Sequence, residues 1–257
     1  MYLNVTRVEP VAYHAPFARV MESSAPRCLQ CPVRGLSVCN AMKQGDLARL
    51  ASASMAISVA PGGIFVSEGD DANHFFIVTE GTAKVFKLLP DGRRQITGFA
   101  TPGDFLGFAA FATYSFGVEA VERVRLCRFT RARMHALLND FPALEKRLLE
   151  VVSNELIVAQ EQMLLLGRKT ARERVATFLL AQAEVSRDDA RRHPNEPRVL
   201  QLPMARRDIA EYLGLTTETV SRTITWLKNQ DLIELVRAST IMIRDPARLQ
   251  RLAAGMP

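Results

Sequence analysis

The sequence has few of the residues that metal-dependent or nucleophilic catalysis requires. Only four of its 257 residues are histidines, and they are scattered without the spacing of metal ligands: His14, His74, His135 and His193. We find no paired carboxylates, nucleophile motif or Gly-rich phosphate loop that would support catalysis. The sequence therefore predicts that the protein is not an enzyme.

Long apolar segments are also lacking. Residues 1–27 contain no apolar core of the length that a secretory signal needs, and three prolines interrupt them. The most apolar run, residues 105–117, is too short to span a bilayer. We therefore expect a soluble, cytoplasmic protein that is not associated with membranes. Cysteines are normally reduced in the cytoplasm, so the four cysteines favour a metal or redox role over disulfides.

The composition that is present is that of a folded protein. A length of 257 residues suits two domains, and an apolar content of 48% excludes a disordered chain. The formal net charge is +6 and the pI is about 9.4. A basic protein suits a polyanionic partner without requiring one.

Residues 204–231 have the pattern of a helix-turn-helix. One apolar helix face is followed by a glycine, where a residue tolerant of positive φ fits easily, and then by a second apolar face. Thr216 or Thr217 can cap the second helix. The faces and the turn are made by Ile209, Ala210, Leu213, Gly214, Leu215, Val220, Ile224 and Leu227.

The outer face of the second helix is polar. Glu218, Ser221, Arg222 and Thr225 are spaced i, i+3, i+4, i+7, and Thr217 precedes them. A recognition helix presents such a stripe to the major groove, where Arg can bond guanine and Glu can accept from cytosine. The alternative is the solvated face of an ordinary helical hairpin. We predict that these residues bind double-stranded DNA.

The rest of the chain predicts an α+β fold made of successive parts. Residues 1–45 are an arm with a cysteine cluster, 46–140 a β-barrel or jelly-roll sensor domain, 141–168 a dimerisation helix, and 169–257 a winged helix-turn-helix domain. We expect helices at 46–53 and 171–185, strands at 57–59, 64–66, 75–78, 83–86, 95–97 and 124–129, and a wing from 233–236 and 240–243.

The long helix carries apolar residues in alternating steps of three and four. This heptad pattern predicts a dimer seam, and the alternative is an amphipathic helix packed only on its own barrel. The seam residues are Leu149, Val152, Leu156, Ala159, Met163 and Leu166.

Several motifs between residues 46 and 249 resemble the cyclic-AMP receptor protein superfamily. They are Glu68-Gly-Asp, Gly81 before a strand, Pro102-Gly-Asp-Phe-Leu-Gly107 and the helix-turn-helix. Within it, Glu218-Thr-Val-Ser-Arg222, Gln95-Ile-Thr-Gly-Phe99 and residues 102–108 are similar to the fumarate-and-nitrate-reduction regulator (FNR) branch. The resemblance implies a one-component transcription regulator.

A cyclic nucleotide does not suit this chain. A buried phosphate needs an Arg or a comparable set of donors. The related nucleotide site has a Glu and then an Arg after the Pro-Gly-Asp turn, whereas residues 105–118 (FLGFAAFATYSFGV) contain neither acid nor base. Phe108 and Ala109 stand where the Glu is expected.

The cysteines are arranged as C-x2-C-x7-C near the amino terminus, with one more on the last strand of the β-domain. Cys28, Cys31, Cys39 and Cys127 could hold zinc or an iron–sulfur cluster by their number, while Cys127 could instead be a buried apolar residue. The resemblance favours a [4Fe–4S] cluster, because oxygen-sensing members of the FNR branch bind one through three amino-terminal cysteines and one in the barrel.

The resemblance implies an oxygen-responsive regulator that binds DNA as a homodimer when its cluster is present. It implies TTGAT-like half-sites, with Glu218 and Arg222 at the G·C pair and Ser221 beside the thymines. It also implies that the charged turn Leu89-Pro-Asp-Gly-Arg-Arg94 contacts RNA polymerase, although a plain solvated hairpin is the alternative. Other hypotheses are a FixK-like or cyclic-AMP-type regulator without a cluster, and a ligand-binding regulatory module. Because every seam residue is apolar, we expect the dimer to persist when the cluster is lost.

Overall fold

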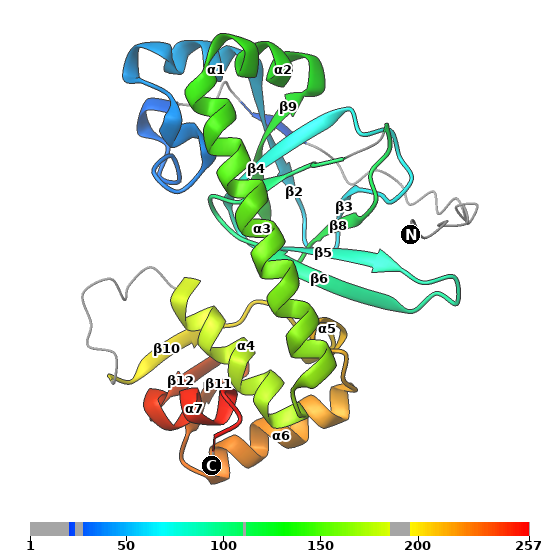
Figure 1. Ribbon diagram of the computed structural model, residues 1–257, viewed down its shortest axis with the longest axis vertical. Helices are drawn as coiled ribbons and strands as arrows, with labels where there is room; N and C mark the ends of the chain where they lie inside the picture. Colours follow the sequence, from blue (N-terminus) through cyan, green and yellow to red (C-terminus); the bar gives the residue numbers. More distant parts are fainter. Residues whose placement is uncertain (1–20, 24–27, 110–111, 186–195, 257) are drawn as a thin grey trace. The chain divides into compact units, whose positions relative to one another are not determined.

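The computed structural model describes residues 21–23, 28–109, 112–185 and 196–256 (Figure 1). The chain divides into two compact units, residues 1–151 and 152–257, and each is described by itself. The division falls within α3 (Pro142–Arg168), which follows Phe141 as the sequence predicts. Within the described residues, no helix is long and apolar enough to cross a membrane.

The first unit contains two antiparallel sheets. One has the order β1 (Met21–Ser23), β2 (Ser54–Val59), β9 (Val124–Thr130), β4 (His74–Glu80) and β7 (Phe105–Leu106). The other has the order β3 (Ile64–Val66), β8 (Gly117–Ala120), β5 (Ala83–Leu88) and β6 (Arg94–Ala100). All six predicted strands lie within these elements.

The jelly-roll form of the prediction is confirmed, whereas a closed barrel is wrong. In the described part of the chain the two sheets share no ladder, and turns such as Pro61-Gly62 and Pro102-Gly103 carry the chain from one sheet to the other. An apolar core fills the space between them, and its fully buried members are Val59, Val78, Ala83, Val118, Ala120, Val124 and Leu126.

A second core lies between the five-stranded sheet and short helices. It joins Leu47 and Leu50 of α1 (Leu47–Ala53), Met134 of α2 (Arg131–Asp140) and Leu144 of α3 to Phe129 of β9. The predicted helix at 46–53 corresponds to a 3-10 turn, η3 (Gln44–Asp46), and α1. Two further 3-10 turns, η1 (Cys28–Gln30) and η2 (Val38–Ala41), carry Cys28 and Cys39, which pack against this core.

The second unit is a winged helix-turn-helix. Its helices are α4 (Ala171–Val185), α5 (Arg206–Leu213), α6 (Thr217–Asn229) and α7 (Pro246–Ala253). The predicted wing forms as β11 (Ile233–Arg237) and β12 (Thr240–Ile243), and β10 (Arg198–Gln201) adds a third strand beside β12. Residues 186–195, between α4 and β10, lie outside the described residues.

Candidate DNA-binding surface and cysteine site

Gly214 makes the turn between α5 and α6. It has φ 61° and ψ 39°, the left-handed conformation, and its N–H donates to the Ala210 carbonyl. A Cβ added to Gly214 would lie 3.2 Å from Cδ2 of Leu166, closer than most carbon contacts. Backbone conformation and lack of space therefore both favour glycine at this position.

The recognition helix α6 begins at a threonine cap. Oγ1 of Thr216 accepts a hydrogen bond of 3.1 Å from the Thr219 N–H, which satisfies one of the free donors of the first turn. Val220, Ile224 and Leu227 are buried, as predicted. Their burial fixes which face of α6 points to solvent.

The outer face of α6 consists of Thr217, Glu218, Ser221, Arg222 and Thr225, and all five side chains are exposed. Arg222 Nη2 lies 2.6 Å from Glu218 Oε1, with side-chain exposures of 80% and 70%. The hydroxyls of Ser221 and Thr225 donate to carbonyls one turn earlier in α6. The structure thus brings the predicted base-reading residues together on one accessible stripe.

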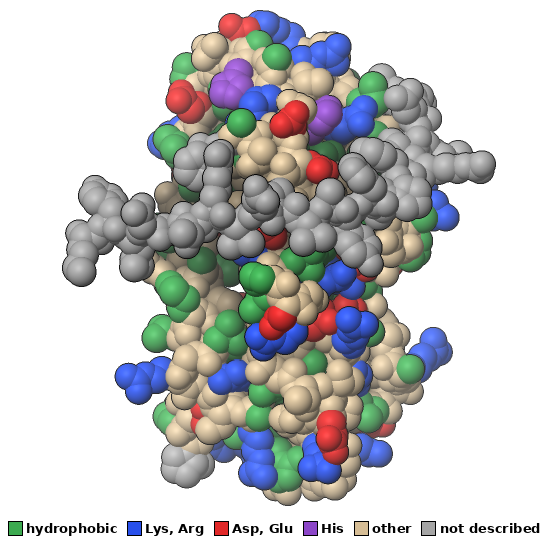
Figure 2. All heavy atoms as spheres, turned by 90° about the vertical axis from the view of Figure 1, so that its right-hand side faces the viewer, with side chains coloured by type: hydrophobic (Ala, Val, Ile, Leu, Met, Phe, Trp, Pro, Cys, Tyr) green, Lys and Arg blue, Asp and Glu red, His purple; other side chains and the backbone are tan. Residues whose placement is uncertain are grey.

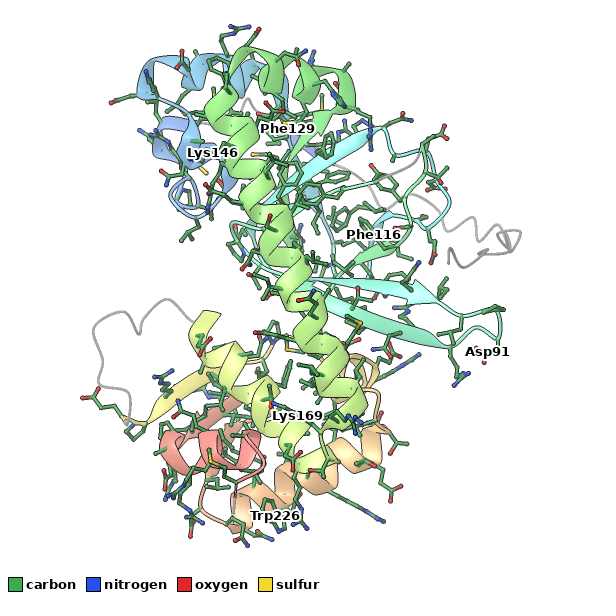
Figure 3. The ribbon with its side chains drawn as sticks, in the orientation of Figure 1. Asp91, Phe116, Phe129, Lys146, Lys169 and Trp226 are labelled. Carbon is green, nitrogen blue, oxygen red and sulfur yellow. The ribbon has the colours of Figure 1, made fainter. Side chains whose placement is uncertain are left out.

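Two basic residues beside α6 and α5 were not singled out from the sequence. The guanidinium of Arg172 stacks on the ring of Trp226, 4.1 Å from its centroid, and Figure 3 shows Trp226 on α6. Arg206 begins α5 and is half-buried, and burial lowers its pKa. Among the described residues no carboxylate forms an ion pair with Arg206. Lys and Arg side chains recur over the face shown in Figure 2.

Arg174 connects the end of α3 to the end of α5. Its Nη2 donates to the Leu166 carbonyl at 2.8 Å, Nε to Lys169 at 2.9 Å and Nη1 to Leu213 at 2.9 Å. Gln162 adds a bond of 2.9 Å to the Tyr212 carbonyl. Carbonyls at helix ends have no partner within the helix. The Arg174 guanidinium supplies donors to such carbonyls at the ends of both α3 and α5.

Most of the predicted seam residues on α3 are exposed. The exposed fractions are 63% for Leu149, 42% for Val152, 61% for Leu156 and 66% for Met163. Ala159 is exposed as well, while Leu166 is half-buried beside Gly214. Ile157 and Leu164, which were not part of the prediction, widen the apolar stripe. The described part of the chain leaves this stripe exposed.

The four cysteines lie on one side of the five-stranded sheet. Cys127 is on its central strand β9, opposite Ala56 of β2 and Ile77 of β4. Cys28, Cys39 and Cys127 all pack against the second core, and none of the four is in a disulfide. Residues 28–39, here called the cysteine loop, also contact the sheet turn, since Leu36 packs against Gly103.

Burial governs the acidity of these thiols. It raises the pKa of Cys127 to about 12 and of Cys39 to about 11, and it also raises the pKa of Cys28. Charge on Cys39, Cys28 or Cys31 raises the pKa of Cys127 further, so these three sulfurs lie within electrostatic reach of Cys127. With their raised pKa values, Cys28, Cys39 and Cys127 are protonated near neutral pH, whereas a bound metal centre deprotonates its thiol ligands.

The chemistry of this set fits a metal centre, although its present geometry is not that of a formed one. Within the described residues, no three or more His, Cys, Asp or Glu side chains converge as metal ligands do. The set nevertheless combines four reduced thiols with Arg34, whose buried Nε has no hydrogen-bond partner among the described groups. Thiolate ligands and an unused N–H donor suit a sulfur-rich centre.

The segment after the Pro-Gly-Asp turn is filled by aromatic side chains. Phe105 lies 4.9 Å from Phe108 and 5.4 Å from Phe75, measured between ring centroids. The Tyr114 hydroxyl donates to the His74 carbonyl at 2.7 Å. This packing agrees with the absence of phosphate-binding side chains from the sequence of residues 105–118.

The β5–β6 hairpin ends in an exposed charged tip, at Asp91 in Figure 3. Arg93 Nε lies 2.7 Å from Asp91 Oδ2, with side-chain exposures of 76% and 53%. Leu88 and Leu89 beside the tip are also exposed.

Comparisons with known proteins agree with this architecture. A family model for the cyclic nucleotide-binding domain matches residues 56–141, and one for the Crp-like helix-turn-helix domain matches residues 173–252. The transcriptional activatory protein AadR of Rhodopseudomonas palustris is 41% identical over 89% of this chain and 94% of its own. The nitrogen fixation regulation protein FixK of Bradyrhizobium diazoefficiens is 38% identical over 93% and 99%.

Similarity extends to a third regulator and to solved structures. The transcriptional activator protein FnrL of Cereibacter sphaeroides is 37% identical over 87% of this chain and 90% of its own. The structure of FixK2 from Bradyrhizobium japonicum matches with a TM-score of 0.71 and 34% identity, over 77% of this chain and 96% of that one. These relatives are transcription regulators and not enzymes. The chain belongs to the Crp/Fnr family of DNA-binding transcription regulators, on its FNR and FixK side.

Proposed function

We propose that this protein is an oxygen-responsive transcription activator of the cytoplasm. It binds a palindromic DNA site as a homodimer when Cys28, Cys31, Cys39 and Cys127 hold a [4Fe–4S] cluster. The observation that carries this proposal is the packing of Cys28 and Cys39 against the same core as Cys127 of β9, with Cys31 within electrostatic reach of Cys127, in a chain whose recognition helix is complete. Similarity to regulators named as FnrL and Anr supports it.

The exposed outer face of α6 supports DNA reading. Arg222 and Glu218 would exchange their mutual ion pair for a guanine and a cytosine, which places them at the G·C pair of a TTGAT-like half-site. Ser221 lies beside them and would contact the thymines. Arg206 begins α5, and Arg172 lies in the first turn of α4 and stacks on Trp226 of α6. Both would bind phosphates.

The apolar stripe on α3 supports the homodimer. Five of the six predicted seam residues are exposed, and a second copy of α3 would remove them from water. Two-fold symmetry would then set two copies of α6 against half-sites about one helical turn apart. Through their hydrogen bonds to α5, Arg174 and Gln162 would make the orientation of α5 depend on that of α3.

The four thiols would supply the complete ligand set of the cluster, and the cluster would supply the reaction with oxygen. Because three ligands belong to the cysteine loop and one to β9, their ligation would tie the loop to the sheet. Losing that tie would free a loop that packs on the same core as the start of α3. This gives the chain a way to convert ligation into a change at the dimer helix.

Anaerobic purification tests this proposal. We expect brown protein with roughly four iron and four sulfide per chain. Cys28→Ser and Cys127→Ser should each remove the colour, and both should lower affinity for a TTGAT palindrome to that of the air-exposed protein. A colourless wild-type protein that binds DNA equally well with and without air would reject the cluster. Stoichiometric zinc in that protein would indicate a structural zinc site instead.

A FixK-like regulator without a cluster is the second candidate. Similarity to FixK proteins over nearly the whole chain favours it. The cysteines distinguish the two candidates, since a FixK-like protein should activate transcription in air and should tolerate serine at all four positions.

The β5–β6 tip is proposed to contact RNA polymerase. Its exposure and its charged side chains are the features that support this role. Asp91→Ala and Arg93→Ala should abolish activation while leaving DNA binding intact, and unchanged transcription from both variants would exclude the contact.

A further inference from the structure

Arg34 lies inside the cysteine loop and is held there by its own bonds. Its Nη2 donates to the Met42 carbonyl at 2.9 Å, and its main-chain N–H donates to the Cys31 carbonyl at 3.3 Å. Its carbonyl accepts from the Ser37 hydroxyl, which in turn accepts from the Cys39 N–H, both at 3.3 Å. The Met42 bond therefore fixes the guanidinium, and the other bonds fix the main chain of Arg34 within the cysteine loop.

One donor of this guanidinium is unused. Nε of Arg34 is buried, and no group of the described chain accepts its N–H. A buried donor without a partner destabilises the folded state, so proteins seldom leave one unless another molecule completes the bond. The Met42 bond keeps the guanidinium from turning to solvent.

The cysteine sulfurs are acceptors within electrostatic reach of this guanidinium. The positive charge of Arg34 acts on Cys28, and the negative charges of Cys28 and Cys31 act on Cys39 and Cys127. Once ligated, these sulfurs are thiolates and accept hydrogen bonds. A cation inside the loop also offsets the excess negative charge of four thiolates.

We propose that Arg34 is a positioning residue that donates its Nε–H to a sulfur of the group bound by the four cysteines, and thereby slows the loss of that group in air. The inference rests on the proposed cluster. Hydrogen bonds to cluster sulfurs and nearby charge set the stability and potential of such centres. Arg34 would thus adjust how much oxygen the regulator tolerates before it responds.

Two substitutions separate the effect of the Nε–H hydrogen bond from the effect of the positive charge. Arg34→Lys keeps the charge and can still reach the Met42 carbonyl, but it lacks the Nε–H. Arg34→Met removes charge and donors together. Arg93→Met, at the exposed tip of the β5–β6 hairpin, is the matched control. The readouts are iron and sulfide per chain, the half-time of colour loss in air, the Fe–S stretching bands in resonance Raman spectra, and thermal unfolding of the cluster-free protein.

We expect both Arg34 variants to lose colour about 10-fold faster than wild type and to show shifted Fe–S bands, since outer partners of metal ligands typically contribute on that scale. The cluster-free variants should unfold as wild type does. If neither Arg34 variant retains iron while both cluster-free variants unfold as wild type does, the result also supports the proposal, because the cluster is then lost before it can be measured.

Other outcomes overturn it. If Arg34→Lys matches wild type, charge and not the Nε–H is responsible. If both variants match wild type in colour loss, or if both destabilise the cluster-free protein with unchanged colour loss, Arg34 is only a structural residue. In these cases the wild type is still brown, so the proposed function stands. A colourless wild type would instead remove the proposed cluster, and this role with it.

Discussion

At the scale of single residues, the side chains proposed to act on DNA are those that the chain leaves exposed. Glu218 and Arg222 form an ion pair with each other on the solvent side of α6. An exposed ion pair of this kind contributes little to stability, in general about 0–1 kcal/mol. Replacing it by contacts to bases therefore costs the folded protein little.

Arg222→Ala should weaken binding to the specific palindrome by about 1–3 kcal/mol and relax the preference at one base pair of each half-site. The reason is the loss of a bidentate donor that no neighbour replaces. Competition binding against half-sites with single substitutions measures both effects. Arg251→Ala on α7 serves as the control. A uniform loss of affinity for all sequences would assign Arg222 to the phosphate backbone instead.

His74 predicts a dependence of stability on pH. Burial lowers its pKa below the ordinary value of 6.5, and the charge of Arg128 lowers it further. The neutral imidazole is therefore favoured in the folded state. Its contribution to stability is fully present above pH 6.5 and is lost as the pH falls through that value toward the folded pKa.

We expect the free energy of unfolding of the cluster-free protein to decrease on acidification below about pH 6.5, and His74→Asn to reduce this dependence. Urea unfolding at a series of pH values measures it. His135→Asn, on the exposed face of α2, is the control. An unaltered pH profile in His74→Asn would show that other groups dominate.

At the scale of elements, α3 is the part whose sequence and structure are easiest to relate. Its heptad pattern predicts a seam, and the structure leaves five of the six seam residues exposed. The heptad pattern does not predict that the last turn of α3 is attached to α5. That attachment depends on Arg174, which lies on the next helix.

Arg174→Met should reduce DNA affinity without changing the oligomeric state. It leaves the Leu166, Lys169 and Leu213 carbonyls without their donor, at a cost to stability of about 0.5–1.5 kcal/mol for each bond. DNA titration and sedimentation of the same sample check the two halves of this prediction. Arg174→Lys should recover only part of the loss, because lysine lacks the planar fork. Full recovery by lysine would mean that charge alone matters.

At the scale of the whole molecule, the question is whether cluster loss separates the dimer. The exposed stripe on α3 is apolar throughout and is wider than the predicted seam. We expect sedimentation at micromolar concentration to show dimers both before and after exposure to air. Oxygen would then act by reorienting the DNA-binding units. A clean monomer after exposure would contradict this.

Ala159→Asp should weaken that dimer, because it places a charge at the centre of the seam. Sedimentation of the variant should show monomer at concentrations where wild type is dimeric. Ala143→Asp, in the first turn of α3 and outside the seam, is the control, since an acidic residue there is compatible with the helix dipole. Equal dimerisation of both variants would place the dimer contact elsewhere.

The parts that were not predicted have identifiable reasons. Residues 105–117 lack the alternation of a strand, and β7 exists because Phe105 and Leu106 pair with Ile77 and Phe76. By contrast, α7 has a local signal that could have been used, since Asp245 caps its first turn and Pro246 occupies it.

The sequence by itself determined the recognition helix, the glycine of its turn, the apolar seam and the set of four cysteines. Each of these depends on spacing along a single element, which helical or strand periodicity makes readable. Only the tertiary structure decided that the sheets remain open, that Cys127 packs against the same core as Cys28 and Cys39, that Arg174 joins α3 to α5, and that Nε of Arg34 has no partner in the described chain. Those features depend on groups that are distant in sequence or on the absence of an acceptor, and packing alone brings them about.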